Sequence, residues 1–297
     1  MKQVTLAIVI PVGPTCKVDY VSDTIESVLH YVTSSHVIIV LDDSGRGTGT
    51  AIKDRFRDVV ILTTEKNYGK NSGLYLNLSR GFAFAYENYD FDVLLRLDTD
   101  ALVIGHNPEK DAIDYFHQNP DFGIIGSYRV DCNGDPRDFS WPRNRLTKEL
   151  SLICPLINPF KRLKGWLFLR KLFHQNRKNG YEAGEHCMGG AYFISRECIG
   201  RLSKTNLLSC QEISWSKLEE DQIFGLLMYS VGLRHGDFAT DSFPMGLRHR
   251  GLPCLPEDLI NKRKKVTHST RFFKNLSEQT IRVFFRDQRQ SAGAVMK

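Results

Sequence analysis

The first 126 residues of the chain alternate short, uninterrupted apolar runs with longer segments of helical periodicity. Apolar runs of about four to eight residues are typical of strands that are buried on both faces. Helices between such strands provide the cover, so the alternation predicts an α/β fold: a mixed, mostly parallel sheet with helices on both faces. The predicted strands are residues 4–11, 36–41, 59–64, 92–97 and 122–127, and the predicted helices are residues 21–32, 49–57, 72–88 and 109–118.

Two glycines, Gly189 and Gly190, open the next predicted strand, MGGAYFIS. Without a β-carbon, the backbone at these positions can approach a ligand closely. An apolar helix then begins with Glu219, Glu220 and Asp221. Their negative charges suit the positive end of the helix dipole, and helix capping is the role that we expect for Glu219.

The run LLRLDTDALVIG places two carboxylates directly after a buried strand. If the strand continued through them, Asp98 and Asp100 would share one face and repel each other unless a cation lay between them. Asp90 and Asp92 have the same spacing but precede the strand, whereas open α/β sheets bind ligands beyond the carboxyl ends of their strands. Arg96 shares a strand face with Asp98, and we expect the two to pair because a buried guanidinium needs a partner.

Other strand ends at the same edge of the predicted sheet also carry candidate ligand-binding residues. Pro11 and Val12 close the first predicted strand, and Asp42 and Asp43 follow the second. Asp42 and Asp43 could accept hydrogen bonds from a nucleotide base or ribose, or they could only shape a turn that is rich in Asp, Ser and Gly. Carboxylates thus gather at one edge of the sheet, where we expect a ligand site.

Charge is distributed unevenly along the chain. The net charge is +6, but residues 141–180 hold ten lysines and arginines against one acid, and residues 250–297 hold eleven against four. The seven cysteines are an odd number without a C-x-x-C pair, which is typical of reduced thiols in the cytoplasm. We therefore expect a cytoplasmic protein. No apolar run approaches the roughly 20 residues of a transmembrane helix.

Candidate motifs follow one another along the chain as Asp42-Asp43, Asn67-x-Gly69, Asn77, Asp98-x-Asp100, Gly189-Gly190, Glu220-Asp221 and His249. This order resembles that of the GT-A glycosyltransferases of family 2, and the resemblance covers roughly residues 5–250. Two departures are visible: Arg80-Gly81 stands where the family's second N-x-G is expected, and the Q-x-x-R-W motif of processive polymerases is absent. A single-addition enzyme is therefore expected.

The resemblance implies a GT-A (Rossmann-like) domain that transfers a sugar from a nucleotide diphosphate, with UDP favoured, to a hydroxyl of a saccharide or lipid-linked saccharide in surface polysaccharide biosynthesis. It implies inversion at the sugar, with Asp221 as the base and Glu220 orienting the acceptor, and a Mn²⁺ or Mg²⁺ ion on Asp98, Asp100 and His249. It divides the chain into a nucleotide-binding half (1–126), an acceptor-binding half (127–250) and a basic C-terminal extension (251–297). The implied donor-binding residues are Pro11, Val12, Asp42, Asp43, Asn67, Gly69, Lys70, Asp98, Gly189 and Gly190.

Two basic segments, residues 160–178 and 262–290, mix aromatic and aliphatic residues with lysine and arginine. They could lie on an anionic membrane, at the inner face, and present a lipid-linked acceptor. The first could instead be a basic lid over the donor diphosphate, with its aromatic residues packed in the core. We expect no nucleic acid as a partner.

Three other functions remain to be weighed against sugar transfer. A dinucleotide oxidoreductase is suggested by Gly45-Arg46-Gly47-Thr48-Gly49, but position 50 is Thr and the preceding aspartates would repel a pyrophosphate. A sugar nucleotidyltransferase would need a glycine-rich basic loop after the first strand, which Gly13-Pro14-Thr15-Cys16-Lys17 matches poorly. A membrane- or nucleic-acid-binding protein without catalysis would use the basic segments but would leave the clustered acids without a role.

Overall fold

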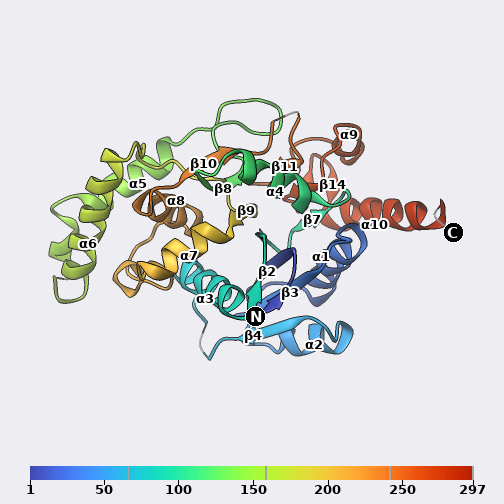
Figure 1. Ribbon diagram of the computed structural model, residues 1–297, viewed down its shortest axis with the longest axis horizontal. Helices are drawn as coiled ribbons and strands as arrows, with labels where there is room; N and C mark the ends of the chain where they lie inside the picture. Colours follow the sequence, from blue (N-terminus) through green and yellow to red (C-terminus); the bar gives the residue numbers. More distant parts are fainter. Residues whose placement is uncertain (66, 158, 241, 296–297) are drawn as a thin grey trace.

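The computed structural model describes residues 1–65, 67–157, 159–240 and 242–295, and it confirms the α/β class (Figure 1). Its main sheet has seven strands in the order β10-β8-β9-β6-β2-β3-β4. Neighbouring strands are parallel except where β9 pairs with β6 and β8. The sheet is therefore mixed and mostly parallel. Its strands are β2 (Leu6–Val12), β3 (His36–Asp42), β4 (Val60–Thr63), β6 (Val93–Leu97), β8 (Phe122–Gly126), β9 (Ala191–Ser195) and β10 (Arg234–Asp237).

Helices cover both faces of the sheet, as the apolar strands predict. Along β2, Leu6 and Ile8 pack into one core with α1, α2 and α4, whereas Ala7 and Val9 pack into the other core with α3, α7 and α8. All four side chains are fully buried, which is why the strand reads as a continuous apolar run. The helices are α1 (Val18–Tyr31), α2 (Thr48–Arg55), α3 (Ser72–Asn88), α4 (Pro108–Gln118), α5 (Ser140–Leu150), α6 (Pro159–Lys178), α7 (Arg196–Lys204), α8 (Glu220–Ser230), α9 (Pro256–Asn261) and α10 (Glu278–Val295).

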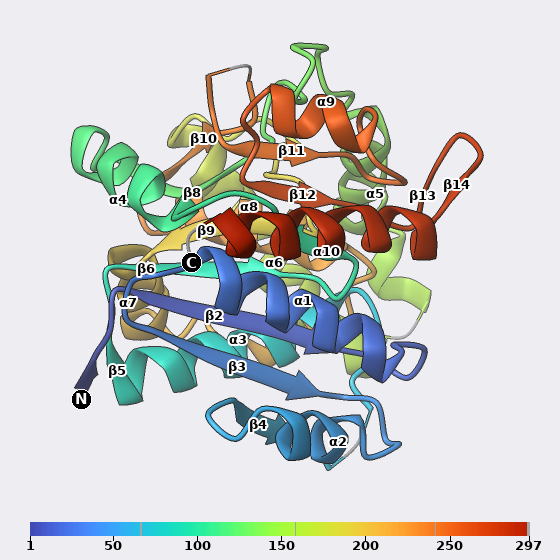
Figure 2. The same cartoon turned by 90° about the vertical axis from the view of Figure 1, so that its right-hand side faces the viewer.

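Residues 251–295 form strands and helices that pack on the rest of the chain. Strand β12 (Val266–His268) pairs antiparallel with β7 (Ala101–Val103) and parallel with β11 (Met245–Leu247). Helix α10 lies along α1 (Figure 2). Remaining short elements are the parallel pair β1 (Lys2–Gln3) and β5 (Tyr89–Asp90) and the hairpin β13 (Phe272–Phe273) and β14 (Leu276–Ser277).

A buried cluster of charges joins α10 to α1. The Arg282 guanidinium contacts the Asp23 carboxylate at 2.8 Å, and both side chains are 1% exposed. Arg289 also binds Asp23, and Arg286 reaches it at 3.6 Å. Arg282 further donates to the carbonyl of Thr99 at 2.6 Å, so that the C-terminal helix holds the turn between Asp98 and Asp100.

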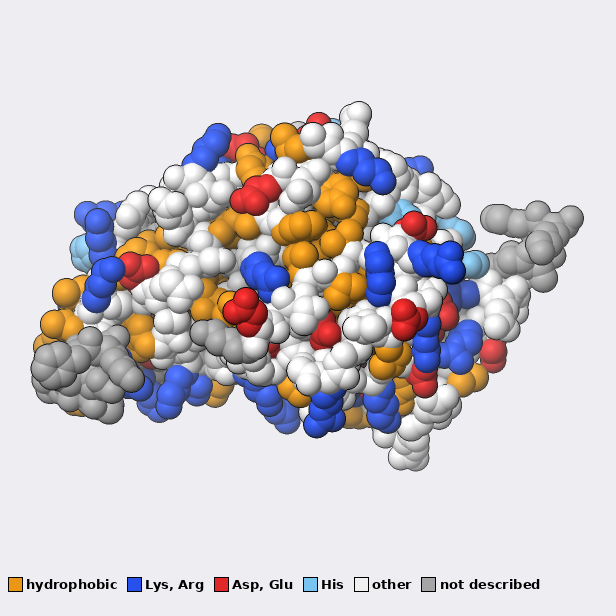
Figure 3. Space-filling model, turned by 90° about the horizontal axis from the view of Figure 1, so that it is seen from below, with side chains coloured by type: hydrophobic (Ala, Val, Ile, Leu, Met, Phe, Trp, Pro, Cys, Tyr) orange, Lys and Arg blue, Asp and Glu red, His pale blue; other side chains and the backbone are white. Residues whose placement is uncertain are grey.

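Helices α5 and α6, with the 3₁₀ turns η1 (Cys154–Ile157) and η2 (Gln211–Ile213), form one end of the molecule, at the left in Figures 1 and 3. Basic and hydrophobic side chains lie next to each other on this end (Figure 3). Helix α6 packs on α8 and η2 through an inner apolar face. Among the helices of the described ranges, none combines the length and apolar character that crossing a bilayer requires.

Candidate active site

A cavity of about 360 Å³ opens where β6 ends and where β9 and α8 begin. It brings together acidic and basic side chains from parts of the chain that lie far apart in sequence. Helix α8 starts at this cavity because Glu219 caps it, as expected: the backbone N–H of Glu219 donates to Gln222 Oε1 at 3.3 Å in a capping box. The predicted site residues that line the cavity are Lys70, Asp98, Asp100, Gly189, Gly190, Glu220, Asp221 and His249.

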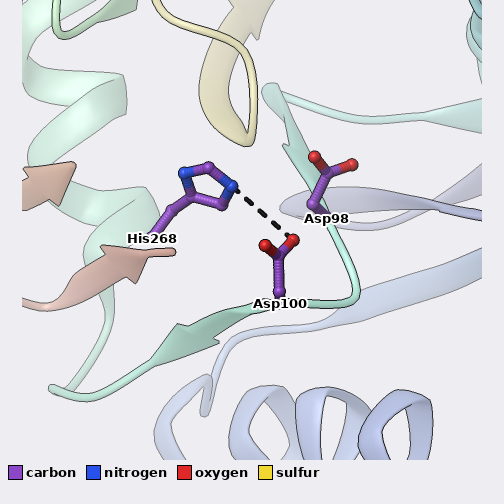
Figure 4. Close-up of side chains that lie close together, drawn as sticks. All are labelled: Asp98, Asp100 and His268. Atoms are coloured by element: carbon purple, nitrogen blue, oxygen red, sulfur yellow. Dashed lines mark ion pairs between the residues drawn. The ribbon is translucent and has the colours of Figure 1, made fainter. Parts of the chain in front are cut away.

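Asp98 and Asp100 lie together because the chain turns between them, not because a strand continues through them. Strand β6 ends at Leu97, and the backbone N–H of Ala101 donates to the carbonyl of Asp98 at 3.0 Å. The condition considered from the sequence, a strand that continues through both aspartates, is not met. The strand has to end here because the next strand, β7, belongs to another sheet with β12. Both carboxylates nevertheless border the same space (Figure 4).

His268, at the end of β12, completes a group of three possible metal ligands with Asp98 and Asp100. One ligand atom from each residue lies within 4.8 Å of the others, and His268 Nε2 is 3.6 Å from Asp100 Oδ1. His268 Nδ1 is 3.0 Å from the carbonyl oxygen of Arg248, a contact that places the proton of a neutral imidazole on Nδ1. Nε2 then faces the carboxylates with its lone pair. Two carboxylates and one imidazole suit Mn²⁺, and the oxygens alone suit Mg²⁺.

His249, the histidine expected at the metal, lies elsewhere on the cavity wall. It is exposed and does not belong to the group of three ligands found among the described residues. The structure therefore favours His268 as the third ligand. Sequence reasoning missed His268 because its position depends on the pairing of β12 with β7, which are more than 160 residues apart.

The two glycines that open β9 make room for other site residues. A β-carbon on Gly190 would lie 2.5 Å from the His268 ring, and Gly190 has a φ of +96°. A β-carbon on Gly189 would lie 3.0 Å from Asp221 Oδ2. The close approach predicted at these glycines is thus, in this structure, an approach to His268 and Asp221.

Asp98 and Asp100 differ in their electrostatic environment. Burial raises the pKa of Asp98, against the opposing effect of the Arg96 charge. Burial alone would also raise the pKa of Asp100, but the contact with His268, the charge of Arg271 and a hydrogen bond from Ser269 hold it well below its usual range. Ser269 Oγ donates to Asp100 Oδ2 at 2.8 Å, and Arg271 Nε lies 2.7 Å from the same oxygen. Asp100 therefore stays ionised at neutral pH.

Arg96 connects the two aspartates to the acidic start of α8. Its guanidinium lies 2.9 Å from Asp98 Oδ1 and 3.0 Å from Glu220 Oε1, and its side chain is 1% exposed. The predicted pairing of Arg96 with Asp98 is confirmed. The buried guanidinium of Arg96 thus lies between one acidic side chain from each side of the cavity.

Glu220 and Asp221 occupy different environments although they are neighbours. Burial raises the pKa of Glu220 to about 8, although the Arg96 charge opposes the rise. Asp221 Oδ2 accepts a hydrogen bond from the backbone N–H of Gly189 at 2.8 Å, and Oδ1 accepts one from Gln222 at 2.8 Å. Each oxygen of Asp221 keeps a further lone pair that could accept a proton or a hydrogen bond.

His186 lies beside Asp221 and is itself contacted by Arg137, and neither residue belongs to a recognisable sequence motif. His186 Nε2 lies 3.6 Å from Asp221 Oδ2, and Arg137 contacts the same ring nitrogen at 3.2 Å. Burial lowers the pKa of His186, so the ring is neutral. With Nδ1 2.8 Å from the carbonyl oxygen of Gly184, Nε2 is the acceptor for Arg137.

Asp42 and Asp43 use their carboxylates within the protein. Asp42 accepts hydrogen bonds from the backbone N–H groups of Ser44 (3.0 Å) and Gly49 (2.7 Å). Asp43 accepts from Thr64 Oγ1 (2.7 Å) and from the backbone N–H groups of Tyr68 and Gly69. Both aspartates are buried, at 3% and 5% exposed. The structure supports the turn-shaping role that the sequence left open, more than contact with a base or ribose.

Several predicted donor residues contact Asp43 and do not line the cavity. Asn67 donates to the carbonyl of Asp43 at 2.6 Å, and Val12 accepts the backbone N–H of Asp43 at 2.9 Å. Asp43 thereby fixes the loop that carries Lys70 to the cavity wall. The predicted donor residues that do not line the cavity are Pro11, Val12, Asp42, Asp43, Asn67 and Gly69.

No protein-family model matches the sequence, and no curated protein matches it significantly. Solved structures do resemble the fold. A mannosyltransferase of Pyrobaculum calidifontis, in complex with GDP-Man and Mn²⁺, is 12% identical with a TM-score of 0.45 over 80% of this chain and 56% of its own. TarS of S. aureus is 14% identical with a TM-score of 0.43 over 78% of this chain and 35% of its own. A shorter TarS structure, in complex with UDP, is 13% identical with a TM-score of 0.44 over 79% of this chain and 58% of its own.

This chain thus spans between about a third and somewhat more than half of the length of those structures. Identities of this size with TM-scores below 0.5 establish no common function. The activity has to be inferred from the site residues.

Proposed function

We propose that the protein is a metal-dependent, inverting glycosyltransferase that moves a sugar from a nucleotide diphosphate, with a UDP-sugar favoured, to a hydroxyl of a saccharide or lipid-linked saccharide. One observation carries the proposal. A group of three possible metal ligands, Asp98, Asp100 and His268, shares a cavity with two acidic side chains in different environments, Glu220 and Asp221. This is the pair of functions that sugar transfer needs: a cation for the leaving diphosphate and a base for the acceptor hydroxyl.

The residues present fit a divalent cation. Asp98, Asp100 and His268 would hold it, with His268 oriented by its contact to the carbonyl of Arg248. A bound Mn²⁺ or Mg²⁺ would offset the negative charge that develops on the diphosphate as it leaves. Lys70 and Arg271 line the same cavity and provide further positive charge for phosphate oxygens.

Asp221 is the proton acceptor in this proposal. The acceptor oxygen bonds to the anomeric carbon, the bond from that carbon to the diphosphate oxygen breaks, and the acceptor proton passes to Asp221. The backbone N–H groups of Gly189 and Gln222 hold the Asp221 carboxylate in one orientation for this step. Glu220, whose pKa of about 8 leaves it largely protonated at pH 7, can donate a hydrogen bond to the acceptor or the donor sugar.

The dinucleotide alternative is disfavoured by the glycine loop itself. The start of α2 is occupied by the Asp42 carboxylate, which accepts the backbone N–H of Gly49 at 2.7 Å. A β-carbon on Gly49 would lie 2.7 Å from Asp42 Oδ2, so this glycine makes room for the aspartate. A pyrophosphate at this helix start would meet a buried negative charge.

The proposal is tested by a thermal-shift panel of UDP-, GDP- and dTDP-sugars with and without Mn²⁺. We expect stabilisation by at least one nucleotide sugar that depends on Mn²⁺, and no such stabilisation in Asp100→Ala. If none of the nucleotide sugars stabilises the protein in a metal-dependent way, a binding protein without catalysis is favoured. The released product separates the two enzyme classes, because sugar transfer releases a nucleoside diphosphate and a nucleotidyltransferase releases pyrophosphate or consumes it.

Asp221→Asn separates catalysis from binding. In this variant we expect metal-dependent nucleotide stabilisation to persist while transfer falls by about 10²-fold or more, the scale of a lost general base. Transfer that survives in Asp221→Asn but is abolished in Asp100→Ala would refute the base assignment and leave the metal site standing.

A further inference from the structure

Exposed hydrophobic residues concentrate at the end of the molecule formed by α5 and α6. Ten large hydrophobic residues are exposed in the described part of the chain, and five of them lie within residues 141–167. The other five are scattered from the N-terminus to α10. The concentrated group consists of Trp141 (51% exposed), Leu152 (70%), Ile153 (69%), Leu163 (46%) and Leu167 (55%).

The same stretch presents only positive charge to solvent. Residues 141–180 contain ten lysines and arginines and a single acid, Glu149. Glu149 is buried and accepts hydrogen bonds from Ser216 Oγ and from the backbone N–H of Lys217, both at 2.7 Å. Its charge is therefore directed inward, and the exposed ionisable side chains of this stretch, such as Arg170 and Lys171, are basic.

Helix α6 has an inner and an outer face. Trp166, Leu169 and Leu172 are buried in the core that includes α8. Leu163 and Leu167 lie one turn apart on the outer side. The core-packed aromatic residue expected of a basic lid is thus present, yet no side chain described in α6 lines the cavity of Asp98 and Asp221. Phe160, one of the aromatic residues considered from the sequence, lies outside the described side chains.

The second basic segment, residues 262–290, does not offer such a surface. On α10, Ile281 and Phe285 are buried, and Arg282 and Arg289 are buried against Asp23. The expectation that this segment also contacts a membrane is not supported, because its apolar side and part of its charge are used inside the protein. Among the described residues, only the α5–α6 end combines exposed leucines with an excess of positive charge, of which Lys164 is paired with Glu212 at 2.9 Å.

We propose that this surface, defined by Trp141, Leu152, Ile153, Leu163 and Leu167 with Arg170 and Lys171 and termed the α5–α6 face, docks on an anionic lipid bilayer. Exposed leucines and a tryptophan enter the headgroup region, and lysine and arginine contact anionic headgroups. A protein partner would have to be both apolar and acidic to match this surface, on which basic side chains outnumber the one partly exposed acid, Glu212. The charge of the face complements an anionic bilayer directly.

Docking on the α5–α6 face would also bring a lipid-linked acceptor close to Asp221. This corollary rests on the proposed function. Arg145, in the middle of α5, donates to the carbonyl of Lys217 at 3.1 Å, two residues before the cap of α8. Helix α5 has 11 residues and spans roughly 16 Å. An acceptor saccharide on a membrane lipid could therefore reach Asp221 while its lipid stays in the bilayer.

Vesicle sedimentation of the full chain tests the proposal. The probes are vesicles of phosphatidylcholine alone and of phosphatidylcholine with phosphatidylglycerol. We expect binding to the anionic vesicles, at least about tenfold weaker binding to the neutral ones, and a loss of about fivefold for each charge removed in Arg170→Gln and Lys171→Gln. Leu163→Glu with Leu167→Glu should reduce binding by more than about tenfold. Val283→Glu, at a 39% exposed position on α10, is the matched control and should bind as the unmodified chain does.

Circular dichroism confirms that each variant is folded, since all the substituted side chains are exposed. No binding of the unmodified chain to anionic vesicles overturns the proposal, as does equal loss in Val283→Glu or unchanged binding in the double leucine variant. A dimer in light scattering that dissociates in the double leucine variant, without vesicle binding, would show that a second copy covers the face. None of these measurements uses a nucleotide or metal, so a negative result would refute membrane docking without affecting the transferase proposal. Equally, a failure of the nucleotide and metal experiments would not affect membrane docking.

Discussion

Arg271 forms an ion pair with Asp100, with 2.7 Å between Arg271 Nε and Asp100 Oδ2. The arginine side chain is 67% exposed, whereas the aspartate side chain is 8% exposed. An exposed side chain therefore neutralises a buried proposed metal ligand. A divalent cation at Asp100 has to compete with the guanidinium for this oxygen, and Arg271 would then be released beside the diphosphate.

Removal of this competitor should strengthen binding of the metal alone. We predict that Arg271→Gln binds Mn²⁺ up to about fivefold more tightly than the unmodified chain, since an exposed ion pair contributes about 0.2–1 kcal/mol. The same variant should bind a UDP-sugar with Mn²⁺ more weakly. Calorimetric titration measures both. Arg250→Gln is the control, because Arg250 lines the cavity without a described ion pair to either aspartate. Equal or weaker Mn²⁺ binding in Arg271→Gln would contradict the competition.

The two glycines of β9 should affect different halves of the site. Gly190→Ala places a β-carbon against the His268 ring and strains a backbone with φ of +96°, so we predict weakened Mn²⁺ binding, on the scale of His268→Ala. Gly189→Ala places a β-carbon against Asp221 instead and should lower the transfer rate with little change in Mn²⁺ affinity. Calorimetry together with a transfer assay separates the two effects. Identical phenotypes would mean that the glycines act only through the stability of the strand.

The sequence predicted the strands and helices of the first half well because their apolar periodicity is local. Helix 72–88 ends where predicted, since its core-facing side chains repeat along one face. The site was predicted in part for the same reason: Asp98 and Asp100 directly follow a buried strand. His268 and Arg271 could not be found in this way. They reach Asp100 through pairing of β12 with β7, a contact between distant segments that leaves no local pattern.

For Asp42 and Asp43 the sequence located the residues but could not decide their role. Their position after a strand is equally consistent with a ligand site and with a turn. Only the hydrogen bonds from Gly49, Tyr68 and Gly69 show that the carboxylates are used within the protein. Such backbone donors cannot be read from residue types. The packing of residues 251–295 could not be predicted for a related reason, because the partner of Arg282 is Asp23, at the other end of the chain.

The buried contact between α10 and α1 should stabilise both the fold and the site. Arg282→Met leaves a buried Asp23 with one partner fewer and frees the carbonyl of Thr99. We predict a loss of about 3–5 kcal/mol in the free energy of unfolding, and weaker Mn²⁺ binding in the protein that remains folded. Arg286→Met removes a longer, partly exposed contact to the same Asp23 and should cost less than about 1 kcal/mol. Urea denaturation of both variants checks this, and equal losses would contradict the role of Arg282.

Glu220 should make stability depend on pH. Its folded-state pKa of about 8 lies above its ordinary value of 4.5, so the folded protein binds this proton more tightly than the unfolded chain does. The resulting stability is fully present below pH 4.5 and is lost as the pH rises toward 8. We predict that Glu220→Gln becomes progressively more stable than the unmodified chain between pH 5 and 9, by roughly 2 °C in Tm for each kcal/mol.

Glu197→Gln is the control for this effect. Glu197 is exposed on α7, and a hydrogen bond from Arg201 lowers its pKa, so its removal should give no gain at high pH. Melting curves of the three proteins across this range decide the matter. A constant difference between Glu220→Gln and the unmodified chain at every pH would show that Glu220 does not titrate in this window.

The most direct test of the central claim is a Mn²⁺ titration, followed by the electron paramagnetic resonance signal of the free ion, with UDP present and absent. We predict one Mn²⁺ per chain, bound more tightly with UDP, at least about tenfold weaker binding in His268→Ala, and nearly unchanged binding in His249→Ala. Loss of binding in His249→Ala with retention in His268→Ala, or no stoichiometric Mn²⁺ in the unmodified chain, would contradict a cation site built by Asp98, Asp100 and His268.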